Sequence, residues 1–272
     1  ASLYQIEPFA VAFPRSQEQV VDLVLAAQET GVPLIARGAG TGLAGGAVGS
    51  GVIVNLAQYN RRITDLNRDR ATVRVEPGVV LDQLNAFLRP HGFCFGPDVA
   101  TSSRATLGGM IGNNSSGARS PLYGTTADNI VSLEVVFADG TTGVIGNSDS
   151  CLDDIQSKVA TILQQLPKGY EKRFPLTSVK RMAGYGLDRY VRNGFNLTDL
   201  ICGSEGTLAV VTGATLSIRP LPREKGLALL FFDSVTDALS ACVELNDLDP
   251  IAVEHIDRAL FDQTRGQLAF RS

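Results

Sequence analysis

A glycine-rich run at residues 36–51, ARGAGTGLAGGAVGSG, most limits what this chain can fold into. It holds seven glycines and follows a short apolar segment at residues 32–35 that is typical of a strand. Glycine tolerates positive φ and lets successive main-chain N–H groups converge on an anion such as a phosphate. Ordering each glycine costs up to about 1 kcal/mol relative to alanine, so a merely flexible surface loop is the weaker explanation. The run predicts close approach of the backbone to a phosphate-bearing ligand.

Two common nucleotide-binding motifs do not account for this run. A P-loop needs Lys followed by Ser or Thr after its last glycine, and that pair is absent. Gly40, Gly42 and Gly45 match G-x-G-x-x-G, but that motif opens a helix and is followed by an acidic residue about 20 positions later. Here the chain continues into residues 52–56, which have the pattern of another strand. We therefore do not expect a dinucleotide bound at a helix N-terminus.

Composition excludes several classes of function. The 272 residues are 44% hydrophobic and 19% charged with a net charge of −4, which predicts a globular chain of one large or two smaller domains. Without a basic run interleaved with aromatics, nucleic acid is not an expected partner. The four cysteines form no C-x-x-C pair, so they indicate neither a zinc site nor an iron–sulfur cluster. No apolar run reaches the ~18 residues that span a bilayer, so we expect no transmembrane helix. We expect a cytoplasmic protein, with peripheral attachment to a membrane left open.

Hydrophobic periodicity predicts alternating helices and strands. Ser16 and Gln19 have capping-box spacing at the start of a helix that ends at Gly31. The other predicted strands lie at residues 63–67, 71–75, 133–137, 141–145, 208–218 and 227–232, and the other predicted helices at residues 80–88, 150–166 and 238–245. Pro220 and Pro222 indicate a domain boundary. The roughly 50 residues after it bury too little surface to fold alone, so we expect the front part of a longer protein.

Two further segments carry candidate binding groups. Residues 96–124, GPDVATSSRATLGGMIGNNSSGARSPLYG, combine close-approach glycines with short hydroxyl and amide side chains, as expected of a wall around a polar, extended ligand. A mobile loop is the alternative. Residues 199–222, DLICGSEGTLAVVTGATLSIRPLP, place Glu205 between a glycine-flanked turn and a strand. An acid in that position indicates a functional role.

Together, in this order and spacing, these segments resemble the FAD-binding domain of the vanillyl-alcohol oxidase superfamily, also called PCMH-type, over about residues 8–222. The match resembles most the branch of the glycolate oxidase D-subunit, D-lactate dehydrogenase and D-2-hydroxyglutarate dehydrogenase. The resemblance implies an α+β fold with a PCMH-type domain at residues 1–220, built of two α+β subdomains (about 1–76 and 77–220) with FAD between them. Residues 221–272 would begin a truncated substrate or cap domain.

The resemblance also implies which residues bind the cofactor. The diphosphate loop would be Arg37, Gly38, Ala39, Gly40, Thr41, Gly42 and Leu43. The flavin-side segment would contribute Pro97, Asp98, Thr101, Ser102, Gly108, Gly109, Asn113, Ser115, Gly117 and Tyr123, followed by Glu205 and Gly206 near the ribityl and adenine end and Val211 on the covering strand. Many members of the superfamily tether the flavin through a histidine in the first glycine loop. Residues 36–51 contain no histidine, so we expect FAD to be held non-covalently.

The chemistry implied by the resemblance is oxidation of a D-2-hydroxy acid, of the D-lactate, glycolate or D-2-hydroxyglutarate type, by hydride transfer to flavin N5. The substrate would be a small anion, and the electron acceptor and general base are unassigned. Arg119, Lys180 and Arg181 are candidate cations for the substrate carboxylate, and Tyr185 is a candidate for the flavin face. The three cations could equally be solvent-facing charges, and Tyr185 could equally be a packed aromatic. A divalent metal or an iron–sulfur cluster, where one occurs, would belong to later polypeptide.

Two other functions stay open on the sequence alone. In the first, the chain is an isolated FAD-binding or partner-docking module without turnover. Alternatively, it would belong to another enzyme on the same scaffold, such as an alcohol oxidase or an NADPH-dependent enolpyruvyl reductase. Fold-level analogy does not separate these functions.

Overall fold

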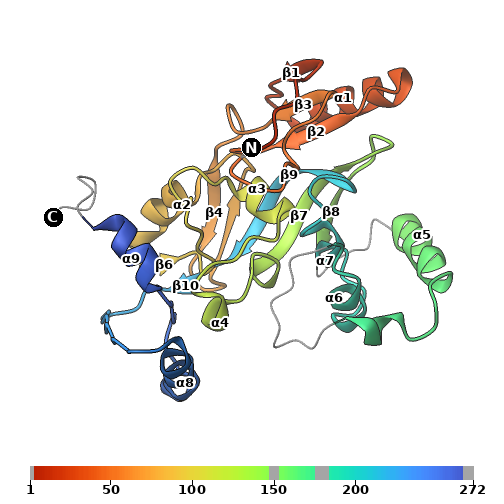
Figure 1. Ribbon diagram of the computed structural model, residues 1–272. Helices are drawn as coiled ribbons and strands as arrows, with labels where there is room; N and C mark the ends of the chain where they lie inside the picture. The colour runs from red at the N-terminus through yellow and green to blue at the C-terminus, as the bar shows by residue number, and fades with distance from the viewer. Residues whose placement is uncertain (1–2, 147–152, 175–183, 266–272) are drawn as a thin grey trace.

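The structure, a computed structural model, describes residues 3–146, 153–174 and 184–265 (Figure 1). These residues form a small parallel sheet, a larger antiparallel sheet, a two-stranded antiparallel sheet and surrounding helices. The strands are β1 (Ala10–Ala12), β2 (Leu34–Arg37), β3 (Val52–Asn55), β4 (Ile63–Asn67), β5 (Thr72–Val75), β6 (Phe93–Cys94), β7 (Ile130–Phe137), β8 (Thr142–Gly146), β9 (Ala209–Ser217) and β10 (Arg219–Pro220). The α-helices are α1 (Gln17–Thr30), α2 (Leu81–Leu88), α3 (Leu107–Gly112), α4 (Ser120–Tyr123), α5 (Asp153–Gln164), α6 (Leu187–Arg192), α7 (Thr198–Ile201), α8 (Val235–Leu245) and α9 (Arg258–Thr264). Short 3-10 turns are η1 (Arg89–His91), η2 (Ala127–Asn129), η3 (Tyr170–Arg173) and η4 (Asn246–Leu248).

The small sheet has the strand order β1-β3-β2, and all of its pairs are parallel. Helix α1 connects β1 to β2, and the sequence predicts this helix and the strand after it but not β1. The Ser16 hydroxyl accepts a hydrogen bond from the Gln19 amide at 3.5 Å, and Gly31, with φ of 71°, ends the helix. The Gln19 side chain accepts from the Arg15 amide at 2.8 Å. The glycine run lies between β2 and β3, so both of its ends are fixed in this sheet.

The larger sheet has the strand order β4-β5-β9-β7-β8, and its pairs are antiparallel. The predicted hairpin around Asp139 and Gly140 is confirmed, with Leu133 opposite Ile145. The predicted pairing of β4 with β5 is also confirmed. One face of this sheet packs on α2, α3, α6 and α7, and forms the main hydrophobic core. A second apolar cluster joins α1 to β7 and β9 and so fixes the small sheet against the large one.

The strand pairing bears on where the two predicted subdomains meet. Strands β4 and β5 belong to the large sheet, where Val73 lies opposite Leu216 of β9. This pairing favours a boundary between Asn55 and Ile63 over one near residue 76. The division of the chain into residues 1–220 and 221–272 stays a prediction.

The strand predicted at residues 227–232 is wrong, because these residues have no regular secondary structure. Leu227 and Phe231 are 88% and 86% exposed. An apolar run becomes a strand only where a neighbour accepts its backbone hydrogen bonds, and no described strand pairs with it. The helix predicted at residues 238–245 is present as α8, which Figure 1 shows apart from both sheets. The helix predicted at residues 150–166 is α5, and its predicted start lies outside the described residues.

An ion pair crosses β9 at a glycine. Arg74 of β5 and Glu134 of β7 form two parallel hydrogen bonds of 2.6 and 2.7 Å, although β9 runs between their strands. Gly213 lies opposite Glu134, and a Cβ there would lie 2.6 Å from a Glu134 carboxylate oxygen. The bidentate pair therefore requires the missing side chain at residue 213.

We predict that Gly213→Ala lowers the free energy of unfolding by about 1–2 kcal/mol, because the new methyl displaces the Glu134 carboxylate from Arg74. Urea denaturation measures this cost. In a Glu134→Ala background the same substitution should cost less than about 0.5 kcal/mol. Gly226→Ala, whose Cβ would contact nothing within 4 Å, is the control. Equal costs of Gly213→Ala with and without Glu134 would contradict the steric explanation.

Candidate functional site

The three glycine-bearing segments meet around one cavity of about 460 Å³. The glycine loop (residues 36–47) forms one wall, and α3 with its flanking residues (105–116) forms the second. The third wall combines the Ser204-Glu205-Gly206 turn with the first residues of β9. A volume of this size lies in the usual range of about 300–1,000 Å³ for small-molecule sites. The structure thus brings together segments that lie more than 150 positions apart in the sequence.

Most of the predicted cofactor residues border this cavity. Those on its lining are Arg37, Gly38, Ala39, Gly40, Thr41, Gly42, Leu43, Thr101, Gly108, Gly109, Asn113, Ser115, Glu205, Gly206 and Val211. The other predicted cofactor residues are described but do not line the cavity; they are Pro97, Asp98, Ser102, Gly117 and Tyr123. Asp98 and Tyr123 instead hold neighbouring backbone: Asp98 accepts from the Arg119 amide, and the Tyr123 carbonyl accepts from Asn129. The role of all these residues as cofactor contacts stays a prediction.

The glycine loop and α3 touch backbone to backbone. A Cβ at Gly38 would overlap the Thr106 hydroxyl and lie 3.3 Å from the Gly109 backbone. The Thr106 hydroxyl caps α3 by accepting from the Gly109 amide at 3.4 Å. On the other side of the helix, the Gly108 amide donates to the Pro77 carbonyl at 2.8 Å. A Cβ at Gly108 would lie 2.6 Å from the Pro77 Cβ, whereas one at Gly109 would lie 3.3 Å from the Thr106 hydroxyl. The packing therefore requires glycine at residues 38 and 108.

The glycine loop presents free hydrogen-bond donors beside the cavity. Within the described part of the chain, the N–H groups of residues 39–43 donate to no protein acceptor. The Arg37 guanidinium folds back over Gly40, where a Cβ would lie 2.7 Å from Nη2, and donates to the Ala47 carbonyl at 3.4 Å. Arg37 therefore holds the shape of the loop. Unpaired amides of consecutive residues on a cavity wall can bind an anion such as a diphosphate.

Glu205 brings a carboxylate to the same cavity. It has a positive φ of 53°, which costs a non-glycine residue of order 1 kcal/mol and is typical of functional sites. Its amide donates to the Gly112 carbonyl at the end of α3, at 2.8 Å. Its carboxylate faces the glycine loop, since a Cβ at Gly46 would lie 2.6 Å from Oε2. Arg37 and Glu205 are the two residues with ionisable side chains on the described lining.

The residues that the sequence did not predict on the cavity lining are mostly apolar or small. The missed residues are Ala36, Ala44, Gly46, Ala47, Leu56, Pro77, Val99, Ala105, Thr106, Met110, Gly112, Ser116, Ile201, Ser204, Ala209 and Val210. Thr106 and Ser204 lie inside the quoted motifs and could have been found there. Leu56 and Pro77 lie outside the three quoted segments and reach the cavity only through tertiary packing, for which the sequence carries no local signal.

The predicted substrate-side residues have other partners where they are described. Arg119 forms an ion pair with Asp98 at 3.4 Å. The Tyr185 hydroxyl lies 2.9 Å from the Thr207 hydroxyl, beside the third wall. Lys180 and Arg181 lie outside the described residues. None of these observations assigns a catalytic role.

The described cysteines Cys94, Cys202 and Cys242 are free thiols. Burial, reinforced by the charge of Asp199, raises the pKa of Cys202 to about 12, so its thiol stays protonated and unreactive. Burial also raises the pKa of Cys94 against the opposing effect of Arg119. In the described ranges, no group of three or more His, Cys, Asp or Glu residues is placed to hold a metal ion. No described helix combines the length and apolarity needed to cross a bilayer.

Comparison with known proteins agrees with this geometry. A family model described as an FAD binding domain matches residues 8–146. The chain is 36% identical to D-2-hydroxyglutarate dehydrogenase of Escherichia coli over all of its own length, and it spans 28% of that relative. It is 30% identical to D-lactate dehydrogenase of Archaeoglobus fulgidus over 93% of its length, spanning 48% of that relative. A solved structure of alkyldihydroxyacetonephosphate synthase covers 88% of this chain and is itself covered to 40%, with a TM-score of 0.60 and 22% identity, which shows the shared fold.

We predict that Gly38→Ala lowers the free energy of unfolding by about 1–3 kcal/mol, since its methyl overlaps the cap of α3. Gly42→Ala, whose Cβ would meet nothing within 4 Å, should change it by less than about 0.5 kcal/mol. Denaturant unfolding of the two variants without added ligand measures the difference. Equal effects would show that the loop does not pack on α3 as described.

Proposed function

Because the chain belongs to the FAD binding domain family, we propose that its cavity holds FAD non-covalently and that the whole protein oxidises a D-2-hydroxy acid. The observation that carries the proposal is the shared cavity, where unpaired amides of residues 39–43 lie opposite α3 and Glu205. The chain spans 28% of the length of the first relatives it matches. Activity therefore concerns the whole protein, whereas cofactor binding concerns the described residues.

The cavity lining fits FAD at its charged and its apolar parts. The amides of residues 39–43 would bind the diphosphate without a cation, as a backbone nest does. The hydroxyl and amide groups of Asn113 and Ser115 would bind the flavin side, and the Glu205 carboxylate would accept from hydroxyls of the ribityl or adenosine part. Val210 and Val211 would cover an apolar face. Residues 36–51 contain no histidine, so the first glycine loop offers no imidazole for a covalent link.

When bound, the flavin supplies a hydride acceptor, and the protein supplies binding, orientation and exclusion of water. The substrate would be a small 2-hydroxy acid, by similarity to the dehydrogenases of D-2-hydroxyglutarate and D-lactate. Arg37 holds the glycine loop, and Glu205 faces it. We therefore propose that the substrate carboxylate and the hydroxyl proton are bound by groups outside the described lining.

We predict that the purified chain, incubated with FAD and desalted, shows flavin absorption bands that correspond to about one bound FAD per chain. Acid precipitation should release the flavin into the supernatant, because no covalent bond retains it. Absorbance of the supernatant and pellet measures both results. Absence of bound flavin would contradict the proposed cofactor site, and flavin in the pellet would contradict the non-covalent link.

Turnover tests the remainder of the proposal. The whole protein should reduce an artificial acceptor with D-2-hydroxyglutarate, D-lactate or glycolate, and should discriminate against the L-enantiomer of a chiral substrate. Flavin that binds but is reduced by none of the three acids would limit the function to that of an FAD-binding module.

A further inference from the structure

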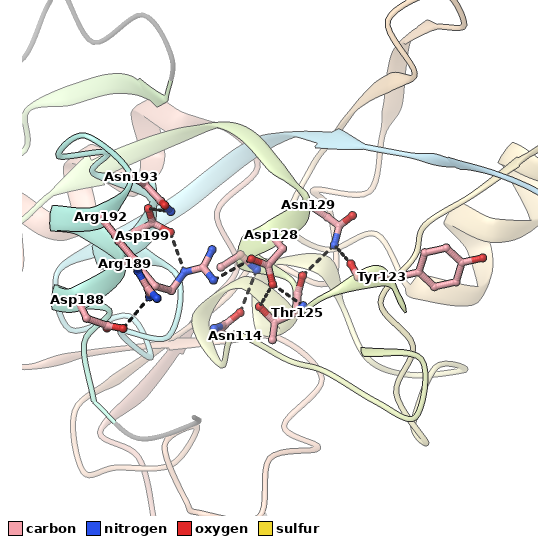
Figure 2. A network of polar contacts seen from close by, with 11 residues as sticks. Asn114, Tyr123, Thr125, Asp128, Asn129, Asp188, Arg189, Arg192, Asn193 and Asp199 are labelled. Atoms are coloured by element: carbon pink, nitrogen blue, oxygen red, sulfur yellow. Dashed lines mark hydrogen bonds and ion pairs between the residues drawn. The ribbon is translucent and has the colours of Figure 1, made fainter. Parts of the chain in front are cut away.

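A polar network lies behind two walls of the cavity and centres on Arg189 of α6 (Figure 2). Its Nε donates to Asp199 at 2.9 Å, and its Nη1 donates to Asp128 at 2.8 Å. Asp199 belongs to α7 and its side chain is 3% exposed, whereas Asp128 belongs to η2. One guanidinium thus joins two acidic residues that are 71 positions apart in the sequence. The fork of nitrogens that Arg provides suits this bridge, and the single ammonium of Lys does not.

Both carboxylates have their second oxygen occupied. The Asp128 carboxylate accepts from the Thr125 amide at 2.7 Å and from its hydroxyl at 2.9 Å. Asp199 accepts from the Asn193 side chain at 2.8 Å. Burial alone would raise the pKa of Asp128, but the Thr125 amide and the Arg189 guanidinium outweigh it and lower that pKa. The Asp128 side of the bridge therefore stays charged at neutral pH.

The Asp128 side of the network holds the second wall. The Ala127 amide donates to the Asn114 side chain at 2.9 Å. The adjacent Thr126 donates twice to the Ser115 carbonyl, from its amide at 2.9 Å and from its hydroxyl at 2.7 Å. Asn114 has a positive φ of 44°, and these bonds maintain that strained turn directly before the cavity-lining Ser115 and Ser116.

The Asp199 side holds the third wall. The α7 residue Ile201 lines the cavity, and its carbonyl accepts from the Ser204 amide at 3.1 Å. Next to it, the Gly203 and Glu205 amides donate to Ile111 and Gly112 of α3. Asp199 lies five residues before Ser204, where this turn begins, and its contact with Arg189 fixes α7 against η2. The separation of the second and third walls therefore depends on the Arg189 bridge in addition to these two direct main-chain hydrogen bonds.

We propose that Arg189 is a positioning residue for the cofactor. Through Asp128 and Asp199 it helps to set the separation of the second wall, at Ser115, from the third wall, at Ser204, and it does not itself touch the ligand. This inference rests on the proposed FAD site. Loss of the bridge should loosen the walls around the flavin and change its environment, while the glycine loop, which the network does not touch, keeps its shape.

The test is an FAD titration of the 272-residue chain and its Arg189→Met variant, followed by the visible circular dichroism of the bound flavin. We expect the dissociation constant to rise about tenfold, the scale set by losing one charged hydrogen-bond pair, and the flavin bands to change shape. A purely stabilising Arg189 would lower the unfolding temperature and the fraction of competent protein, but it would leave the affinity and band shape of that fraction unchanged. Unchanged affinity and bands in Arg189→Met would overturn the proposal.

Arg192→Met is the matched control. It removes an ion pair of 2.9 Å with Asp188 of the same helix, and neither residue lies on the described cavity lining. It should bind FAD as the unaltered chain does, and a matching loss of affinity would overturn the proposal. Should Arg189→Met fail to fold, Asp128→Asn tests the same bridge at its more exposed end, and wild-type affinity and bands there would also overturn it. If the unaltered chain itself does not bind FAD, the proposed cofactor site fails first.

Discussion

The cavity depends on the close approach of three backbone segments around α3. Gly38 lies against Thr106 and Gly109 on one side, where a side chain would not fit. At the other end of the helix, the Glu205 amide donates to the Gly112 carbonyl. A six-residue helix thus fixes the glycine loop and the acidic turn relative to each other. The unpaired amides of residues 39–43 and the Glu205 carboxylate consequently face one volume, which is the physical basis for assigning FAD to it.

The two sheets supply the rigid frame behind these loops. Strands β2 and β3 fix both ends of the glycine run, and β9 follows directly on the acidic turn. The apolar cluster between α1, β7 and β9 joins the two frames. A binding site made of loops on rigid elements is the common arrangement in proteins. Here the second and third walls are held by main-chain hydrogen bonds and by the Arg189 bridge. The glycine loop is held by Arg37 and by its packing on α3.

The sequence predicts the parts of the site whose signals are local. The glycine density at residues 36–51 indicates a close-approach backbone, and the quoted motifs identify the three walls before any coordinates are considered. What it does not reveal depends on contacts between distant residues. Leu56 and Pro77 become lining residues only through packing. Arg189 cannot be told from an ordinary surface residue of a helix until the fold places Asp128 and Asp199 beside it. The strand predicted at residues 227–232 fails for the same reason, since its apolar pattern is local but its pairing partner is not.

Hydrogen–deuterium exchange with and without FAD tests the central claim most directly, because it reports on backbone amides segment by segment. The account predicts that FAD slows exchange together in residues 37–43, 108–116 and 203–211, and leaves α8 unchanged. Protection confined to one of the three segments, or found mainly outside them, would contradict the shared cavity as the cofactor site.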